Sequence, residues 1–200
     1  MGIRVGLGWI TKIKNNYINT FLLVLNDGGG IYLDGKLDST RIVEGNIIMN
    51  GNGKSVGESP AACGIYLDEY TSNVIVRDHT VAMNPYGINL HRANSNLIVN
   101  NTVFGNKVQI AFHNTSFLPT IYRNTINNNI FFSIGKSDLT LFFRSITDDI
   151  PHFGKADNNY YARPSDDDKT FYTFSPLTGK KFRTLSGWQS FTRQDAGSHK

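Results

Sequence analysis

A short strand-like motif occurs four times in this 200-residue chain, and each copy ends in an acidic or imidazole side chain. The copies read GIYLD, GIYLD, GINLH and QIAFH, and their last residues are Asp34, Asp68, His91 and His113. Carboxylates and imidazoles are the side chains that proteins use most for acid–base and nucleophilic catalysis. These four positions are therefore the first candidates for a reactive site.

The alternation within each copy predicts that the chemical side chains share one face. If Ile31 and Leu33 point inward, Tyr32 and Asp34 point outward, because successive side chains of a strand alternate between its faces. The same parity applies to the other copies. The outward residues then form one column of Tyr32, Tyr66, Asn89 and Ala111, and a second column of Asp34, Asp68, His91 and His113.

Stacked carboxyls have a specific chemical use. A retaining glycosidase needs two carboxyl groups about 5–5.5 Å apart, one charged as nucleophile and one protonated as acid. Asp34 and Asp68 on adjacent stacked strands would satisfy that spacing, and their mutual repulsion would split their pKa values. His91 could then hold or relay a proton, while Tyr32 and Tyr66 could contact a sugar.

A second repeated pattern predicts how these strands are positioned. An aliphatic residue is followed three residues on by an Asn-like residue, five on by an aliphatic one and eight on by another Asn. The copies start at Ile13, Ile42, Val76, Ile98 and Ile121. A unit of about 22 residues cannot bury its apolar face alone and must stack on its neighbours. Parallel stacking would bury Ile31, Ile65, Ile88 and Ile110 in one column and Leu33, Leu67, Leu90 and Phe112 in the next.

Asparagine is the most telling residue of the composition, with 22 copies in the chain. Asparagine tolerates the left-handed backbone of sharp corners, and stacked side-chain amides can hydrogen-bond along a ladder. The same reasoning makes His79 a hydrogen-bonded corner residue and predicts that Asn101 and Asn124 lie one above the other. The sequence thus predicts an all-β parallel β-helix of about five coils with a loop-rich C-terminal tail.

The segments NDGGGIYLDG and GIYLDEYTSNVIVRDHTVAMN resemble the right-handed parallel β-helix proteins, in particular their carbohydrate-active members. The segment LSGWQSFTRQDAGS, which carries Trp188, resembles the helix and turn that follow the last coil in that family. The resemblance implies a poly- or oligosaccharide partner and an extracellular or periplasmic location. It also implies that Asp27, before Gly28–Gly30, pairs with Asp68, the glycines leaving a floor for a sugar. Geometry alone favours Asp34 with Asp68, so both pairings stay open.

Other residues and reactions remain as alternatives. Glu69 points away on a regular strand, but it becomes a second candidate acid or sugar contact if the strand ends there. The same face could serve a polysaccharide lyase or uronate epimerase, with His91 or Tyr66 as the base and calcium as the cofactor. A non-catalytic glycan-binding β-helix is the remaining class. For a hydrolase we expect no cofactor and no metal, because no acidic cluster of the sequence is typical of a calcium site.

Composition excludes several classes. The net charge of +4 is modest and scattered, which is not typical of nucleic-acid binding. The longest apolar run, 21–25, is too short to span a membrane. Cys63 is the one cysteine, which excludes an internal disulfide, and we expect it to be buried. The N-terminus shows no signal peptide. We expect coils over 1–145 and loops with a short helix packed on them over 146–200, as one domain or a fragment of a longer protein; the oligomeric state stays open.

Overall fold

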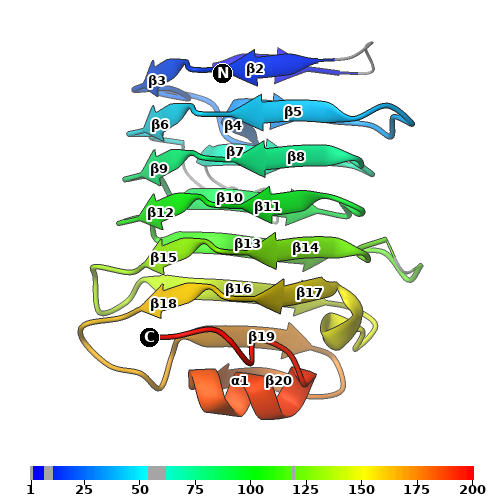
Figure 1. The fold of residues 1–200 in the computed structure, drawn as a ribbon, viewed down its shortest axis with the longest axis vertical. Coiled ribbons are helices and arrows are strands. Elements are labelled where there is room, and N and C mark those ends of the chain that lie inside the picture. The colour runs from blue at the N-terminus through cyan, green and yellow to red at the C-terminus, as the bar shows by residue number, and fades with distance from the viewer. Residues whose placement is uncertain (1, 7–10, 54–61, 119) are drawn as a thin grey trace.

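The computed structural model describes residues 2–6, 11–53, 62–118 and 120–200, and it is a stack of short strands in three sheets (Figure 1). Sheet A has the order β1 (Ile3–Val5), β4 (Gly28–Leu33), β7 (Ala62–Leu67), β10 (Tyr86–His91), β13 (Val108–Asn114), β16 (Leu139–Ser145), β19 (Phe171–Ser175) and β20 (Gly179–Arg183). Sheet B has the order β17 (Gly154–Asp157), β14 (Asn124–Asn127), β11 (Leu97–Val99), β8 (Val74–Arg77), β5 (Arg41–Glu44) and β2 (Lys12–Lys14). Sheet C has the order β18 (Tyr160–Ala162), β15 (Ile130–Phe132), β12 (Thr102–Phe104), β9 (Thr80–Ala82), β6 (Ile47–Met49) and β3 (Tyr17–Asn19).

Each coil contributes one strand to each sheet, and the described strands pair in parallel except for β19 with β20. This arrangement confirms the predicted parallel β-helix of about five coils. The predicted interior columns are also confirmed, because Ile31 pairs with Ile65 and Leu33 with Leu67. Their side chains are fully buried, as are those of the next coils. Such columns replace the single core of a globular domain by a continuous apolar stack.

Glycines stand where sheet C approaches the sheet A strands β4, β7 and β10. A Cβ on Gly30 would lie 2.4 Å from Ile48 Cγ2, and one on Gly64 would lie 2.3 Å from Val81 Cγ1. Both distances are far below van der Waals contact, so a larger residue would push the two sheets apart. Gly30 therefore faces the core, which differs from the predicted floor for a sugar.

The sequence assigns the left-handed corner and the amide ladder to the same asparagine, but two adjacent asparagines serve these roles. Asn100, Asn128 and Asn158 have φ of 57°, 56° and 54° and form the corners between sheets B and C. The asparagine after each corner is buried and joins a ladder: Asn101 Nδ2 donates to Asn129 Oδ1 at 2.9 Å. The left-handed corner and the amide ladder are thus served by neighbouring residues.

The asparagine ladder pairs different residues from those that the sequence predicts. Asn101 lies against Asn129, whereas Asn124 bonds to Asn96, whose Nδ2 donates to Asn124 Oδ1 at 3.2 Å. Both Asn124 and Asn129 fit the repeat pattern, and the prediction chose the wrong one. His79 follows the left-handed corner at Asp78, and its predicted hydrogen bonding to a neighbouring coil is confirmed, since its Nδ1 accepts the backbone N–H of Asn46 at 2.9 Å. Burial lowers the pKa of His79 to about 4, so the ring is neutral.

The stack extends beyond the region expected to form coils. Strands β17, β18 and β19 add another parallel turn within residues 146–200, which were expected to be loops and a helix. The predicted helix is present as α1 (Leu185–Thr192), after the short 3₁₀ helix Ile150–His152. Trp188 of α1 is buried, stacks on Phe143 and Phe171 at 4.6 and 4.8 Å between ring centroids, and closes the apolar column.

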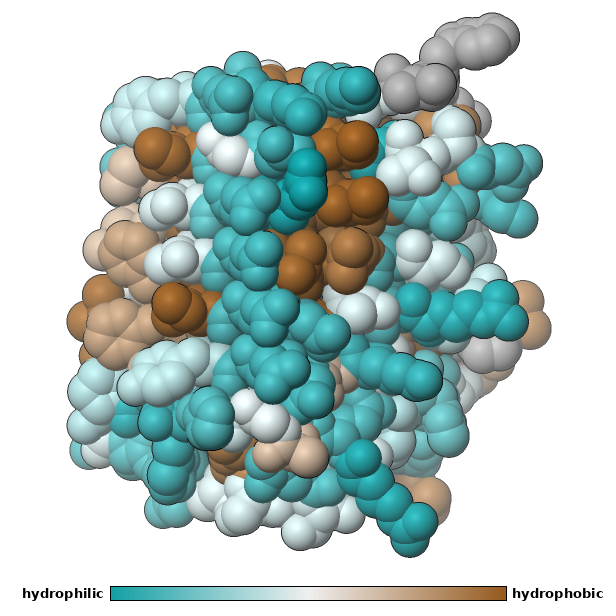
Figure 2. All heavy atoms as spheres, viewed as in Figure 1, coloured by the Kyte–Doolittle hydropathy of each residue, from teal (hydrophilic) through white to brown (hydrophobic). Residues whose placement is uncertain are grey.

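The outer surface is not uniformly polar. Figure 2 shows a band of hydrophilic residues running along the stack, with hydrophobic side chains on either side of it. Ile47, Ile130 and Tyr160, each on a strand of sheet C, are 44–45% exposed. In the described part of the chain, no helix is long and apolar enough to cross a membrane.

Candidate functional site

The register of sheet A brings the predicted chemical residues onto neighbouring coils. Tyr32 pairs with Tyr66, Tyr66 with Asn89, and His91 with His113. β7 ends at Leu67, so its acidic residues follow immediately beyond the strand. Residues separated by more than 20 positions in the sequence therefore lie side by side at one end of these strands.

Asp68 is the centre of this group. Its Oδ2 accepts the Tyr32 hydroxyl at 2.6 Å, and its Oδ1 accepts His91 Nδ1 at 2.7 Å and the Glu69 backbone N–H at 2.9 Å. Burial by itself would raise the pKa of Asp68, but the hydrogen bonds from His91 and Tyr32 outweigh it and lower the pKa. Asp68 is therefore held as a carboxylate.

Tyr66 and Asp68, whose side chains are predicted to point outward, are not exposed to solvent. Tyr66 is 2% exposed and Asp68 is 6% exposed, although Ile65 and Leu67 are buried in the core as predicted. The Tyr32 ring packs edge-on against Tyr66 at 5.2 Å, and its hydroxyl reaches Asp68. One aromatic side chain from the preceding coil thus shields both residues, which the in–out parity of a single strand could not reveal.

Asp27 approaches the same group from the corner before β4. Its φ of +52° turns the chain there, and the Tyr66 hydroxyl makes a long hydrogen bond of 3.5 Å to Asp27 Oδ1. Desolvation, and next the charge of Asp68, raise the pKa of Asp27, although the residue remains accessible to solvent. Two carboxyls from different coils are thus electrostatically coupled, and their pKa values move in opposite directions.

Asp34 has a different partner. Arg4 donates from Nη2 to Asp34 Oδ2 at 2.9 Å, and the Arg4 guanidinium lies over the Tyr32 ring at 5.3 Å. Arg4 is in register with Tyr32, on the coil that precedes both. The structure therefore directs Asp34 toward the N-terminal coil, where its charge is balanced by an arginine.

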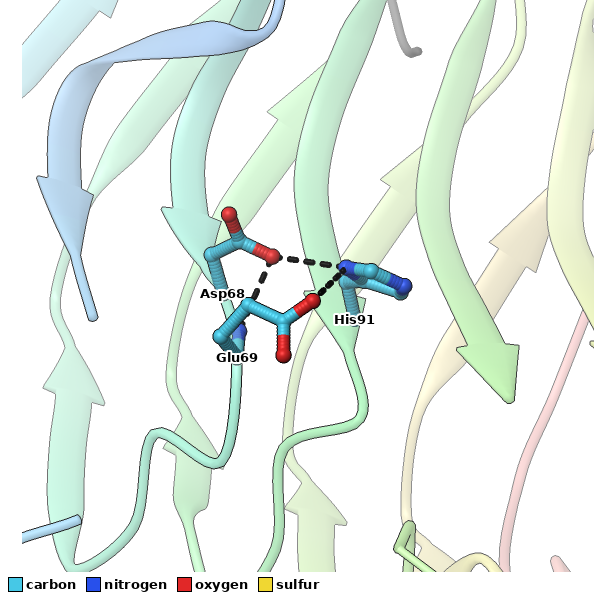
Figure 3. Close-up of side chains that lie close together, drawn as sticks. All are labelled: Asp68, Glu69 and His91. Atoms are coloured by element: carbon cyan, nitrogen blue, oxygen red, sulfur yellow. Dashed lines mark hydrogen bonds and ion pairs between the residues drawn. The ribbon is translucent and has the colours of Figure 1, made fainter. Parts of the chain in front are cut away.

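Glu69 lies beside Asp68 and His91 rather than on the opposite face (Figure 3). The strand has ended, and the backbone turns through φ of +26° at Glu69 and +64° at Tyr70. Glu69 Oε1 is 3.8 Å from His91 Nδ1, and its Oε2 accepts a hydrogen bond from Arg92. From the sequence, Glu69 is expected to join the site only if the strand ends before it, and β7 does end at Leu67.

Asn89 and His113 are adjacent to the site but are not joined to Asp68. Asn89 is fully buried, and its side-chain amide interacts with the thiol of the buried Cys63. The His113 ring packs between the rings of Tyr86 and Phe142 at 6.0 and 5.0 Å. Burial lowers the pKa of His113 to about 3, so this imidazole is neutral and does not take up a second proton at ordinary pH.

Three residues of the site could hold a metal ion. One ligand atom each from Asp68, Glu69 and His91 lies within 4.8 Å of the others. Two ligands of a tetrahedral zinc ion lie about 3.3 Å apart when the bonds are about 2.0–2.1 Å long. The 2.7 Å between His91 Nδ1 and Asp68 Oδ1 is shorter and fits a shared proton. Calcium requires six to eight oxygen ligands, which a set of two carboxylates and an imidazole does not supply.

Two large hollows that are lined by described residues lie elsewhere on the surface. A hollow of about 620 Å³ is lined by apolar side chains of sheet C, including Phe104, Phe132 and Tyr160. It contains none of the coupled groups around Asp68. Perturbed titratable groups are better markers of a reactive site than an apolar hollow is, so the group around Asp68 remains the candidate site.

The comparisons with known proteins define the class that this architecture indicates. Residues 1–143 match the family model described as the right handed beta helix region. The chain therefore belongs to the right-handed β-helix family, and the handedness implied by the resemblance is confirmed. No curated protein and no solved structure matches the chain with significance.

Sequence reasoning missed two residues of the site. Arg4 lies in Ile3–Val5, which is a shortened copy of the sheet A motif with Ile3 in register with Ile31. The alternation of Ile3, Arg4 and Val5 could have identified Arg4 as an outward residue of this sheet from the sequence. Thr115, whose Oγ1 is 2.8 Å from His91 Nε2, follows the end of β13, where no repeat position marks it.

Proposed function

We propose that this protein is a carbohydrate-processing enzyme that hydrolyses glycosidic bonds with Asp68 and Asp27 as its two carboxyls. Asp68 acts as the charged member, either as nucleophile or as the base that activates water. Asp27 acts as the general acid that protonates the leaving oxygen. The substrate is a poly- or oligosaccharide, and by resemblance the enzyme works outside the cytoplasm.

The observation that carries this proposal is the opposite displacement of the two pKa values. Glycosidases need one carboxyl charged and the other protonated at the same pH. Here His91 and Tyr32 donate to Asp68, whose pKa is lowered despite its burial. The pKa of Asp27 is raised, first by desolvation and then by the charge of Asp68. Asp34 is the weaker partner, because its carboxylate already pairs with Arg4.

The same contacts weigh against the lyase and epimerase alternatives. These reactions need a base beside the proton that they remove. Burial, and next the charge or hydrogen bond of Asp68, raise the pKa values of Tyr32 and Tyr66. Both phenols therefore stay protonated and act as donors. His91 has both ring nitrogens engaged, by Asp68 and Thr115.

The test is turnover of a panel of aryl glycosides and oligosaccharides by the full chain and its variants. We expect Asp68→Asn to lower kcat by several orders of magnitude, and Asp27→Asn to lower it by roughly 10²–10⁴-fold for leaving groups that need protonation. Asp34→Asn should have a small effect. Asp78→Asn is the matched control, because Asp78 lies in a corner with φ of +59°, on sheet B's side of the stack.

The outcomes separate the alternatives. Near-full activity in Asp68→Asn would overturn the site, and loss of activity in Asp34→Asn but not Asp27→Asn would assign the acid to Asp34. A product with the ultraviolet absorbance of an unsaturated uronate would indicate a lyase. Binding on a glycan array without turnover by the wild-type chain would indicate a non-catalytic glycan-binding protein.

A further inference from the structure

Both ring nitrogens of His91 are held by side chains from other coils. Nδ1 is 2.7 Å from Asp68 Oδ1, and Nε2 is 2.8 Å from Thr115 Oγ1. The His91 side chain is 20% exposed, so most of the ring is removed from water. Thr115 is half-buried as well. Three groups on three successive coils thus form one hydrogen-bonded chain.

The chemistry of Asp68 decides where the protons of this chain lie. A carboxylate has only acceptor atoms, and Asp68 already accepts the Tyr32 hydroxyl and the Glu69 N–H. His91 must therefore donate from Nδ1. In a neutral ring Nε2 is then an acceptor, and the Thr115 hydroxyl donates to it.

The position of Thr115 is fixed by its neighbours rather than by the histidine. Asn114, the last residue of β13, is fully buried. Its Oδ1 accepts the Ser116 N–H at 3.2 Å and the Thr120 hydroxyl at 2.8 Å, which ties Asn114, just before Thr115, to two residues that follow Thr115. Its Nδ2 donates to Asp149 Oδ2 at 3.2 Å. The backbone that carries the Thr115 hydroxyl is thus anchored independently of His91.

We propose that Thr115 is a positioning residue of this site, whose hydroxyl holds the His91 ring so that Nδ1 keeps its hydrogen and donates it to Asp68. A hydroxyl is suited to this task because it can donate to neutral Nε2 and accept from protonated Nε2–H. The catalytic consequence rests on the proposed glycosidase function, whereas the orientation of the ring does not.

Several other ionisable groups lie near Asp68 and His91 and also influence their protonation. The Asp68 and His91 side chains are surrounded, from β1 through β13, by Arg4, Asp27, Tyr32, Tyr66, Glu69, Arg92 and His113. The test therefore compares variants that keep all of these groups. Thr115→Val removes the hydroxyl at nearly constant volume, and Thr115→Ser retains it. Thr125→Val is the matched control, because Thr125 is a half-buried threonine on β14 of another sheet.

The first measurement is independent of turnover. Nitrogen-15 NMR of the histidine rings in the full chain reports which ring nitrogen of His91 carries the hydrogen. We expect the Nδ1–H form in the wild type, Thr115→Ser and Thr125→Val. In Thr115→Val the ratio of Nδ1–H to Nε2–H should fall about fivefold, the effect of losing one net hydrogen bond. An unchanged ratio in Thr115→Val, or the same fall in Thr115→Ser, would overturn the proposal.

The second measurement is the pH profile of kcat/KM. A merely structural role would lower activity equally at all pH values. A misaligned Nδ1–H would instead raise the pKa of Asp68, and the acidic limb of the profile of Thr115→Val would move to higher pH. Thr115→Ser should restore the position of the limb. An acidic limb that stays in place in Thr115→Val would overturn the catalytic part. A shifted ring ratio in a chain that turns over no glycoside would uphold the positioning role and refute the proposed function instead.

Discussion

Replacing Tyr32 by Phe tests the electrostatics of Asp68 without requiring turnover. The substitution removes the hydroxyl that donates to Asp68 Oδ2 at 2.6 Å and keeps the ring that packs edge-on against Tyr66. A hydrogen bond to a charged group contributes about 1.5–3 kcal/mol. Loss of this hydrogen bond should therefore raise the pKa of Asp68, because the Tyr32 hydroxyl favours the charged carboxylate.

The sign of the stability effect follows from the direction of the pKa shift. The pKa of folded Asp68 lies below its ordinary value of 3.8, so the carboxylate stabilises the fold above that value. This contribution is lost as the pH falls through the folded pKa. Tyr32→Phe should therefore lower the free energy of unfolding by about 1.5–3 kcal/mol at pH 7, and by clearly less at pH 2–3.

Urea denaturation at the two pH values measures this difference, and titration of the Asp68 carboxyl by carbon-13 NMR measures the pKa directly. Tyr17→Phe is the control, because Tyr17 is 65% exposed and its hydroxyl lies 3.9 Å from Met49 Sδ. An equal loss of stability at both pH values would refute the reasoning, since it would mean that the Tyr32 hydroxyl does not favour the charged form of Asp68.

Two further predictions concern the asparagine ladder. Asn101→Ala should lower the free energy of unfolding by about 2–4 kcal/mol, because the buried His79 N–H and Val76 C=O lose their partner, while Asn100→Gly should be nearly neutral at its left-handed corner. Urea denaturation compares the two, and equal effects would contradict the division of tasks. His79→Asn restores the ladder residue of other coils and should reduce the loss of stability as the pH falls from 6.5 toward 4, because in this range histidine of the unfolded chain takes up a proton while the buried ring stays neutral. Melting temperatures at pH 7 and 4.5 measure it, and an unchanged pH dependence would count against a buried neutral ring.

The sequence predicts the fold well because stacking repeats one local rule. The alternation of Ile31 and Leu33 recurs on each coil, so one correct assignment of parity fixes a whole interior column. The same repetition misleads where two residues satisfy the pattern equally. Asn124 lies three residues after Ile121, and Asn129 lies three residues after Ile126, so both fit the pattern. Only the pairing of β11 with β14, in which Ile98 lies opposite Ile126, decides that Asn129 continues the ladder of Asn101.

The site is less predictable because its contacts cross between coils. The parity of β7 places Asp68 outward correctly, but its burial comes from Tyr32 on the preceding coil. Asp34 has the same parity as Asp68 but a different partner, since it forms an ion pair with Arg4. Thr115 lies after a strand end, where no periodicity applies. A pattern within one strand cannot report these partners.

The geometry of a solenoid also explains why the second carboxyl of the proposed site comes from a corner. Side chains in a sheet A column contact only the coils directly above and below, about 4.8 Å away. For Asp68 these neighbours supply Tyr32 on one side and His91 on the other, and both donate hydrogen bonds that favour its charged form. A protonated acid must sit outside that set of donors. Asp27 is turned into place by its left-handed backbone, is contacted by the Tyr66 hydroxyl at 3.5 Å and is affected by the charge of Asp68. The column therefore stabilises one carboxylate, and the corner is where a neighbouring carboxyl can keep its proton.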